Sequence, residues 1–242
     1  MSDNTQKFLP KERPIFVIVM GVASTGKTTL AKALNKRLGL PYVEGDDLHP
    51  KSSIEKMSNG IPLNDADREP WLELIRITAE HMIAEQQAKE QAGTASEEEK
   101  RLRKGVMVTC SALKKYYRDI IRGTYKAHEL PEHLDPAPAE KLPTYFVYIK
   151  PEEGVLRERM AKREGHFMKP QMLDSQLATL ESPEGEEGVI VVPLDATTDE
   201  QVEIALDGLR KMVGELTVDL GARVTEKEEE INVPEELRHV HQ

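Results

Sequence analysis

The sequence has a single cysteine, few aromatic residues and no long apolar run, and these shortages exclude whole classes of protein. Cys110 is the only cysteine among 242 residues, so neither an intrachain disulfide nor a cluster of thiolate metal ligands can form. No window approaches the about 20 apolar residues that a membrane-spanning helix needs. The first residues, MSDNTQKFLPKERP, contain no apolar core and include acidic side chains. We therefore expect neither a secretory signal nor a transit peptide, and a cytoplasmic location.

Positive charge is also in deficit. Lys and Arg together number 33 against 43 Asp and Glu, which gives a formal net charge of −10. A negative field opposes contact with nucleic-acid phosphates, and the sequence shows no basic stripe interleaved with aromatic residues. We expect no nucleic-acid partner and no membrane partner. The length suits one domain with a substantial core.

Short β-branched apolar runs alternate with helix-like stretches. The run IFVIVM at 15–20 predicts a central strand that is buried on both faces, and the helix that follows its glycine-rich loop ends at Gly39. Similar runs occur at 106–110, 145–149 and 189–194, with a weaker one at 41–45. This alternation predicts an α/β fold of three layers, in which a five-stranded parallel sheet has helices on both faces.

Polar or proline-rich stretches interrupt this pattern. Residues 86–104 favour either a solvated helix extension or a flexible loop, and 127–143, with four prolines, favour an irregular surface insertion. The acidic residues 217–242 favour a mobile tail. We expect one domain at 15–216, preceded by an extension at 1–14.

The loop after the first strand satisfies the pattern G-x-x-x-x-G-K-[ST], with Gly21, Val22, Ala23, Ser24, Thr25, Gly26, Lys27 and Thr28. Between a strand and a helix, such a loop directs backbone N–H groups and the helix N-terminus at phosphate. We expect Thr29, which follows Thr28 at the start of the helix, to bind the cofactor together with the loop residues. Lys27 is expected to reach the β and γ phosphates, and the Thr28 hydroxyl to bind Mg²⁺. The loop predicts ATP or GTP with Mg²⁺ as cofactors; the alternative is a chance glycine-rich turn.

The destination of the phosphoryl group depends on the rest of the chain. The central strands lack the terminal Asp or Asp-Glu typical of motors and many ATPases. An acidic run, Glu44-Gly45-Asp46-Asp47, follows the second strand, and the carboxyl ends of parallel strands converge beside the phosphate loop. Asp46 is therefore a candidate base, with a helix N-cap as the alternative.

Four ordered blocks then resemble the gluconate kinase (gluconokinase) family. They are GDDLHP (45–50), KMSNGIPLNDADREPWL (56–72), CSALKKYYRD (110–119) and GHFMKPQMLDSQLATLESP (165–183). The family is a branch of the small-molecule kinases with a phosphate loop, beside shikimate kinase and the adenylate kinases. The resemblance spans about residues 15–213. The polar insertions and the acidic tail depart from the family pattern without breaking a motif.

A kinase for a polyol acid needs a base near the acceptor hydroxyl, a cation for the substrate carboxylate and donors for the other hydroxyls. Asp46 supplies the base, and a bidentate fork suits Arg68 to the carboxylate. His49 and Lys56 are candidate hydroxyl donors. The alternatives are a surface histidine for His49, a solvated charge for Lys56 and a surface ion pair with a neighbouring Asp for Arg68.

Two basic residues follow the third central strand. Lys114 and Arg118 stand four positions apart, so we expect them on one helical face directed toward substrate or phosphate; a solvated basic face is the alternative. Cys110 is better explained as a small buried residue than as a nucleophile, because phosphoryl transfer to a hydroxyl needs no covalent intermediate.

The last block implies a lid over about 164–176, as in the related kinases. Arg159 and Arg163, one helical turn apart, are expected to spread the charge of the transition state, with solvated arginines as the alternative. The resemblance adds His166 and Gln176 as substrate contacts.

The resemblance also implies that Asp195 and Ala196, after the last strand, belong to the loop that grips adenine. The sequence has no guanine-reading Asn-Lys-x-Asp string, which favours ATP over GTP. The implied reaction is phosphorylation of D-gluconate at its 6-hydroxyl, with a homodimer as a common assembly among relatives. The alternatives are a kinase for another small hydroxy acid such as shikimate, and a regulatory protein that binds nucleotide without catalysis.

Overall fold

The computed structural model describes residues 13–126, 142–162, 170–214 and 216, and its centre is one parallel sheet. The strand order is β2-β3-β1-β4-β5, and every neighbouring pair is parallel. The strands are β1 (Ile15–Met20), β2 (Tyr42–Glu44), β3 (Gly105–Cys110), β4 (Thr144–Lys150) and β5 (Val189–Pro193). All five predicted strands are confirmed.

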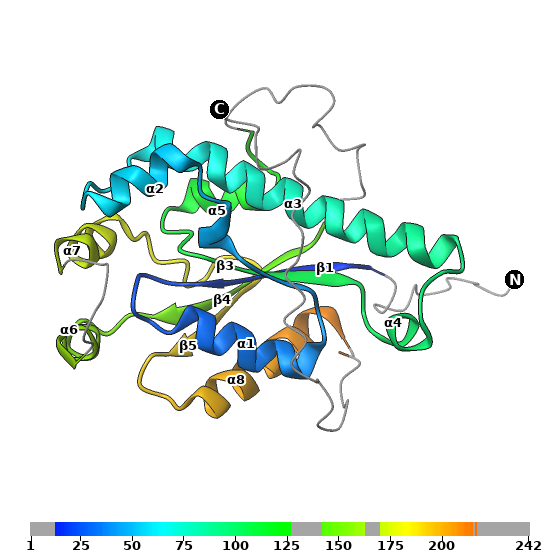
Figure 1. Ribbon diagram of the computed structural model, residues 1–242. Helices are drawn as coiled ribbons and strands as arrows, with labels where there is room; N and C mark the ends of the chain where they lie inside the picture. Colours follow the sequence, from blue (N-terminus) through cyan, green and yellow to red (C-terminus); the bar gives the residue numbers. More distant parts are fainter. Residues whose placement is uncertain (1–12, 127–141, 163–169, 215, 217–242) are drawn as a thin grey trace, which may run out of the picture.

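Helices cover both faces of the sheet, as Figure 1 shows. One face packs α1 (Lys27–Leu38) and α8 (Thr198–Val213), and the other packs α3 (Asp65–Gln91) and α5 (Lys115–Ile121). Parallel strands need crossover connections, and the helices that make them cover both faces. The predicted three-layer α/β fold is confirmed.

The centre of the sheet is buried because its strands carry no polar face. Every residue of β1 and β3 is buried, which matches the continuous apolar run IFVIVM rather than an alternating pattern. Each large apolar side chain buried there contributes about 1.5–3 kcal/mol to folding relative to an exposed one. This rigid centre holds the loops at the carboxyl ends of its strands.

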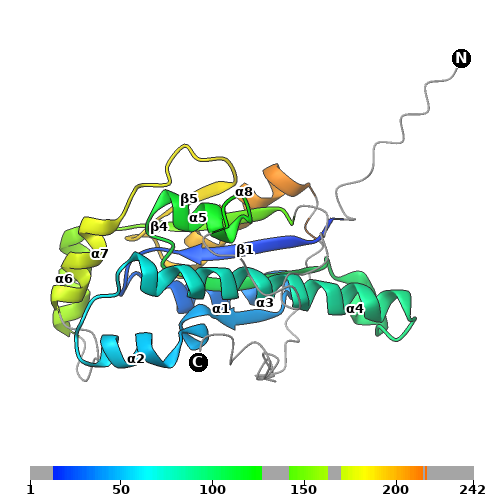
Figure 2. The same ribbon diagram turned by 90° about the horizontal axis from the view of Figure 1, so that it is seen from above.

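The remaining helices lie around the ends of the sheet, where the loops gather. The views of Figures 1 and 2 both show α2, α6 and α7 at one end of the molecule and α4 at the other. The short 3₁₀ helix η2 follows β2 directly. Their bounds are η2 (Gly45–Leu48), α2 (Lys51–Ser58), α4 (Glu97–Arg101), α6 (Glu153–Lys162) and α7 (Pro170–Thr179).

The interrupting stretches have different outcomes. Within 86–104, α3 continues to Gln91 and α4 follows a turn, so this stretch is largely helical. Residues 1–12, 127–141, 163–169 and 217–242 lie outside the described residues, so the predicted tail and most of the proline-rich insertion are not tested. Within the described part of the chain, no helix has both the length and the apolar character needed to cross a membrane.

Candidate active site

The phosphate loop has the backbone shape that its glycines predict. Gly26 ends the loop at φ 92°, a left-handed conformation that favours glycine, and α1 begins at the next residue. Ser24 adopts φ 63° within the loop, which is unusual for a residue with a side chain and is typical of functional turns. The buried Thr25 hydroxyl donates to the carbonyl of Val22 at 2.8 Å, which closes the loop on itself.

Lys27 lies at the centre of the site. Its ammonium donates to the Val22 carbonyl at 3.1 Å, so the side chain folds over the loop. Burial lowers the pKa of Lys27, while the carboxylates of Asp46 and Glu44 act in the opposite direction. The loop therefore holds one positive charge with two acidic side chains close enough to affect it.

Glu44, at the end of β2, has a place in the site that the sequence analysis did not assign. The Thr28 hydroxyl donates to its Oε2 at 2.9 Å, and the Tyr42 hydroxyl donates to the same oxygen at 2.6 Å. The Thr109 hydroxyl donates to Oε1. The sequence signal for Glu44 is an acidic residue at the carboxyl end of a strand. The same signal fits Asp46, two residues later, so the sequence alone does not separate the roles of the two acids.

These oxygens suit Mg²⁺, the ion that the phosphate loop implies. A hydroxyl and a carboxylate meet beside the loop, and hard oxygen ligands of this kind bind Mg²⁺ together with nucleotide phosphates. Among the described residues, no group of three or more His, Cys, Asp or Glu side chains forms a separate metal cage. Thr28 and Glu44 are thus the residues that would hold Mg²⁺ at the phosphates.

The turn after β2 is built around Gly45. A Cβ at this position would lie 1.9 Å from the carbonyl oxygen of Thr109, so only glycine fits. The indole Nε1 of Trp71 donates to the Gly45 carbonyl at 2.7 Å. The turn is therefore fixed by β3 on one side and α3 on the other, with Asp46 following it in η2.

Asp46 and His49 lie together on this turn. The His49 ring stacks on Trp71 with centroids 4.0 Å apart, and its Nε2 lies 4.0 Å from Oδ1 of Asp46. Burial and the Arg68 charge lower the pKa of His49 to about 4, so the imidazole is neutral at physiological pH. Desolvation raises the pKa of Asp46, and the Lys27 ammonium opposes that shift. The Asp46 side chain is nevertheless 72% exposed.

Arg68 is buried on α3 without the surface ion pair that was the alternative. The residue is 7% exposed, and its Nε has no hydrogen-bond partner among the described residues. The neighbouring acids are engaged elsewhere, because Asp65 pairs with Lys114 and Asp67 pairs with Lys56. A buried donor without a partner is costly and is expected to have a ligand.

Lys56 and Lys114 both hold acids in the first turn of α3. The Asn64 side chain accepts from the Asp67 backbone N–H and the Asp67 side chain accepts from the Asn64 N–H, so the pair forms a capping box. Lys56 therefore braces this helix end, and Lys114 reaches Asp65 at 2.7 Å. Each lysine has an ion-pair partner here rather than the solvated charge that was its alternative.

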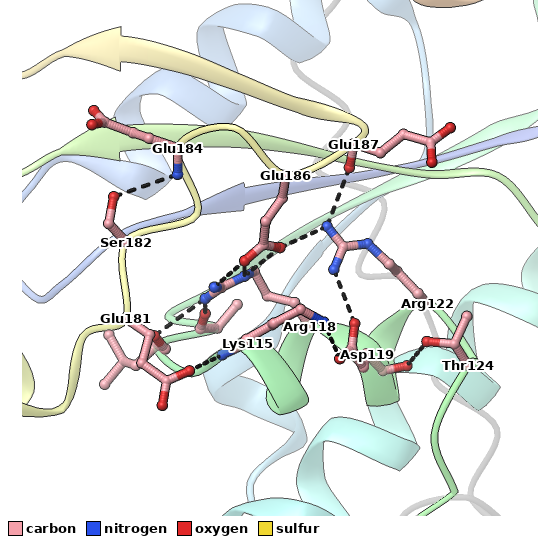
Figure 3. Close-up of polar contacts among 12 residues, drawn as sticks. Lys115, Arg118, Asp119, Arg122, Thr124, Glu181, Ser182, Glu184, Glu186 and Glu187 are labelled. Atoms are coloured by element: carbon pink, nitrogen blue, oxygen red, sulfur yellow. Dashed lines mark hydrogen bonds and ion pairs between the residues drawn. The ribbon is translucent and has the colours of Figure 1, made fainter.

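The expected common face of Lys114 and Arg118 is wrong. Lys114 has extended backbone and precedes α5 as its N-cap, whereas Arg118 lies inside the helix and is fully buried. The Arg118 guanidinium donates to Glu186 and to the carbonyls of Ala112 and Leu113 (Figure 3). Its hydrogen bonds are therefore made within the protein, in a buried ion pair that ties α5 to the segment before β5.

Arg159 on α6 and Gln176 on α7 both contact the phosphate loop. The Arg159 guanidinium donates to the carbonyl of Thr25 at 3.4 Å and to that of Leu194 at 3.1 Å. Oε1 of Gln176 accepts from the Ala23 backbone N–H at 2.7 Å. Both side chains thus lie against the nucleotide half of the site. Arg163 and His166, the other residues of the predicted lid, lie outside the described residues.

The loop after β5 borders an open depression of about 740 Å³. Asp195 and Ala196 line it, together with the start of α8, and Leu194 just before them accepts from Arg159. This loop therefore shares an arginine with the phosphate loop. Cys110, by contrast, is 1% exposed at the end of β3, and burial raises the pKa of its thiol to about 12, so no reactive thiolate is present.

A parallel sheet with a lysine-bearing phosphate loop after β1, an acid at the carboxyl end of β2 and a flanking arginine defines a small-molecule kinase with a phosphate loop. The family described as an AAA domain matches residues 16–183. The chain is 44% identical over 180 residues to a gluconokinase of Gluconobacter oxydans, which covers 74% of this chain and 83% of that protein. The chain belongs to the gluconokinase family.

Further relatives agree with this assignment. A probable gluconokinase of Schizosaccharomyces pombe is 41% identical over 199 residues, 82% of this chain and 89% of its own length. The crystal structure of a gluconokinase from Sinorhizobium meliloti is 38% identical with a TM-score of 0.59 and covers 83% of this chain and 94% of that one. The match extends over most of each chain, so the family resemblance expected from the four sequence blocks is confirmed.

Proposed function

We propose that this protein transfers the γ-phosphoryl group of MgATP to the 6-hydroxyl of D-gluconate, giving 6-phospho-D-gluconate and ADP. The observation that carries the proposal is the buried Arg68, whose Nε has no hydrogen-bond partner in the part of the chain that the structure describes. A planar guanidinium there suits the carboxylate of a sugar acid, and membership of the gluconokinase family supports that acceptor.

The nucleotide half of the site follows from the phosphate loop. Loop N–H groups and Lys27 bind the β and γ phosphates, with Thr28 and Glu44 on the metal side. Bound Mg²⁺ supplies charge neutralisation and alignment of the phosphate oxygens. Residues 195–196 are assigned to adenine, and Arg159, which contacts the phosphate loop, is assigned with Arg163 to the charge of the phosphoryl group in transit.

The acceptor half lies at the turn after β2. Asp46 accepts the proton of the 6-hydroxyl of gluconate while the oxygen of that hydroxyl forms the new bond to the γ-phosphorus. At the same time, the bond between the γ-phosphorus and the bridging oxygen breaks, and that oxygen leaves with ADP. Its raised pKa makes this carboxylate a stronger base than an ordinary aspartate. Neutral His49, with Lys56, Lys114 and His166, is assigned to the remaining substrate hydroxyls. Gln176, expected from the sequence to contact substrate, contacts the phosphate loop instead and is assigned to the nucleotide half.

A coupled assay for ADP tests this function. Wild-type protein with MgATP should release ADP rapidly only when D-gluconate is present, and turnover with shikimate or AMP should be lower by about 10²-fold or more, since only gluconate fits both halves of the site. The Lys27→Ala variant, purified identically, controls for contaminating kinases. Equal turnover with shikimate or AMP would reject the assignment, and ³¹P NMR of the product identifies the phosphorylated hydroxyl.

A further inference from the structure

The carboxylate of Glu44 accepts hydrogen bonds from three hydroxyl groups. Tyr42 and Thr28 donate to Oε2 at 2.6 and 2.9 Å, and Thr109 donates to Oε1. No lysine or arginine among the described residues forms an ion pair with Glu44. Three neutral donors therefore orient the carboxylate, and the Lys27 ammonium interacts with it only at longer range than an ion pair.

Local structure brings two of these donors to Glu44. Tyr42 and Glu44 are two positions apart on β2, so their side chains share one face of the strand. Thr109 stands directly opposite Glu44 in the parallel register of β2 and β3 and is 1% exposed.

The third donor differs from the other two. Thr28 is the second residue of α1, and its hydroxyl oxygen suits Mg²⁺. A hydroxyl that donates its proton to a carboxylate keeps its lone pairs directed elsewhere, which leaves them for a cation. Tyr42 and Thr109 thus orient the Glu44 carboxylate, and the carboxylate in turn orients the Thr28 hydroxyl.

We propose that Tyr42 and Thr109 are positioning residues that hold Glu44 against the Thr28 hydroxyl, so that both oxygens are ready for the Mg²⁺ that accompanies ATP. The inference rests on the proposed function in one respect, that the ligand is a magnesium nucleotide. It assigns Tyr42 no contact with nucleotide or acceptor. Its effect passes entirely through Glu44.

Equilibrium binding of a non-hydrolysable ATP analogue tests this without catalysis. The dissociation constant is measured by calorimetry with Mg²⁺ and again with excess EDTA, and their ratio is the gain in affinity from the metal. Tyr42→Phe should reduce that gain about 3- to 10-fold, less than the full value of a hydrogen bond to a charged group because two other donors still hold Glu44, and leave the EDTA constant within about twofold. Glu44→Gln should reduce it by about tenfold or more.

A double mutant distinguishes positioning from direct action. In the Glu44→Gln background, Tyr42→Phe should have no further effect on the metal-dependent gain, because its only route is through the missing charge. Tyr145→Phe is the matched control, since Tyr145 is also a half-buried strand tyrosine, at the start of β4 and with no hydroxyl hydrogen bond among the described residues. It should leave both constants unchanged.

Thr109 is tested with two variants because its hydroxyl also accepts from the Gly45 N–H at 3.2 Å. Thr109→Val should lower the metal-dependent gain and also destabilise the fold, whereas Thr109→Ser keeps the hydroxyl and should retain the gain. A Tyr42→Phe variant with an unchanged metal-dependent gain, or one that weakens binding equally in EDTA, would overturn the proposal. Wild-type binding that depends on Mg²⁺ without gluconate turnover would instead reject the proposed function and leave this inference standing.

Discussion

The backbone N–H of Ala23 donates a 2.7 Å hydrogen bond to Oε1 of Gln176, which joins the phosphate loop to α7. The Gln176 amide oxygen thus lies against the loop that binds negatively charged phosphates. Gln176→Glu preserves the acceptor and adds a charge, so binding of an ATP analogue should weaken by about tenfold or more through like-charge repulsion. Calorimetry measures it, and Gln176→Ala is the uncharged control. An unchanged constant in the Glu variant would mean that this side chain leaves the loop when nucleotide binds.

Lys27 should be required for turnover and dispensable for folding. Lys27→Ala removes the only side-chain charge carried by the loop, so kcat should fall by about 10²-fold or more. Burial already disfavours the ammonium, as the lowered pKa of Lys27 indicates, so the variant should unfold at a temperature no lower than that of the wild type. Near-normal turnover in this variant would show that the loop does not act on phosphate.

Arg68 should control affinity for the acceptor and leave the nucleotide unaffected. Arg68→Lys keeps the charge and loses the planar fork, so KM for gluconate should rise about tenfold or more while KM for ATP stays constant. Arg210→Lys, which changes an exposed arginine on α8, is the matched control. Equal increases in both KM values would indicate a general distortion of the site instead of a lost substrate contact.

His49 should make stability depend on pH. Its pKa is lowered to about 4 in the folded chain from 6.5, so between these values the unfolded chain binds more protons and stability falls as pH decreases. From pH 7 to pH 5 this group alone should cost about 2 kcal/mol, with the His49→Gln variant spared that part of the loss. Urea unfolding at both pH values measures the difference, and parallel losses in the two proteins would contradict it.

Arg118 should matter for folding. Arg118→Met removes a fully buried guanidinium and one partner of Glu186, which keeps Arg122, so the free energy of unfolding should fall by about 3 kcal/mol, the low end for a broken buried ion pair. Lys115→Met on the same helix removes only an exposed pair with Asp119 and should change it by less than about 1 kcal/mol. Denaturant titration compares the two. A folded Arg118 variant with a selective rise in KM for gluconate would restore the rejected substrate role.

The parts of this molecule that depend on neighbouring residues were predictable from the sequence. The strand at 15–20 and its loop follow from a β-branched run beside Gly26 and Lys27, because burial and turn chemistry there are local. The family blocks extended this to the acceptor side. The blocks indicated Asp46 and Arg68 as site residues, and the structure places both near His49. Their roles in catalysis and substrate binding are proposals.

Relationships across the fold were not predictable in the same way. Arg118 has helical spacing from Lys114, but the spacing argument assumes that the helix includes both residues, and α5 begins one residue after Lys114. Glu186, its partner, is 68 positions away. Glu44 was similarly unremarkable alone, since its three donors come from α1, β2 and β3.

The tight packing at Gly45 has a consequence for how such an enzyme can change. Gly45, between Glu44 and Asp46, packs against the Thr109 backbone and accepts a hydrogen bond from Trp71. The two acids are therefore separated by a rigid partition. In the proposed function, Glu44 serves the Mg²⁺ side and Asp46 serves the acceptor alcohol. Mutations on the Asp46 side of the partition can therefore change the preferred acceptor without altering the side that binds the nucleotide.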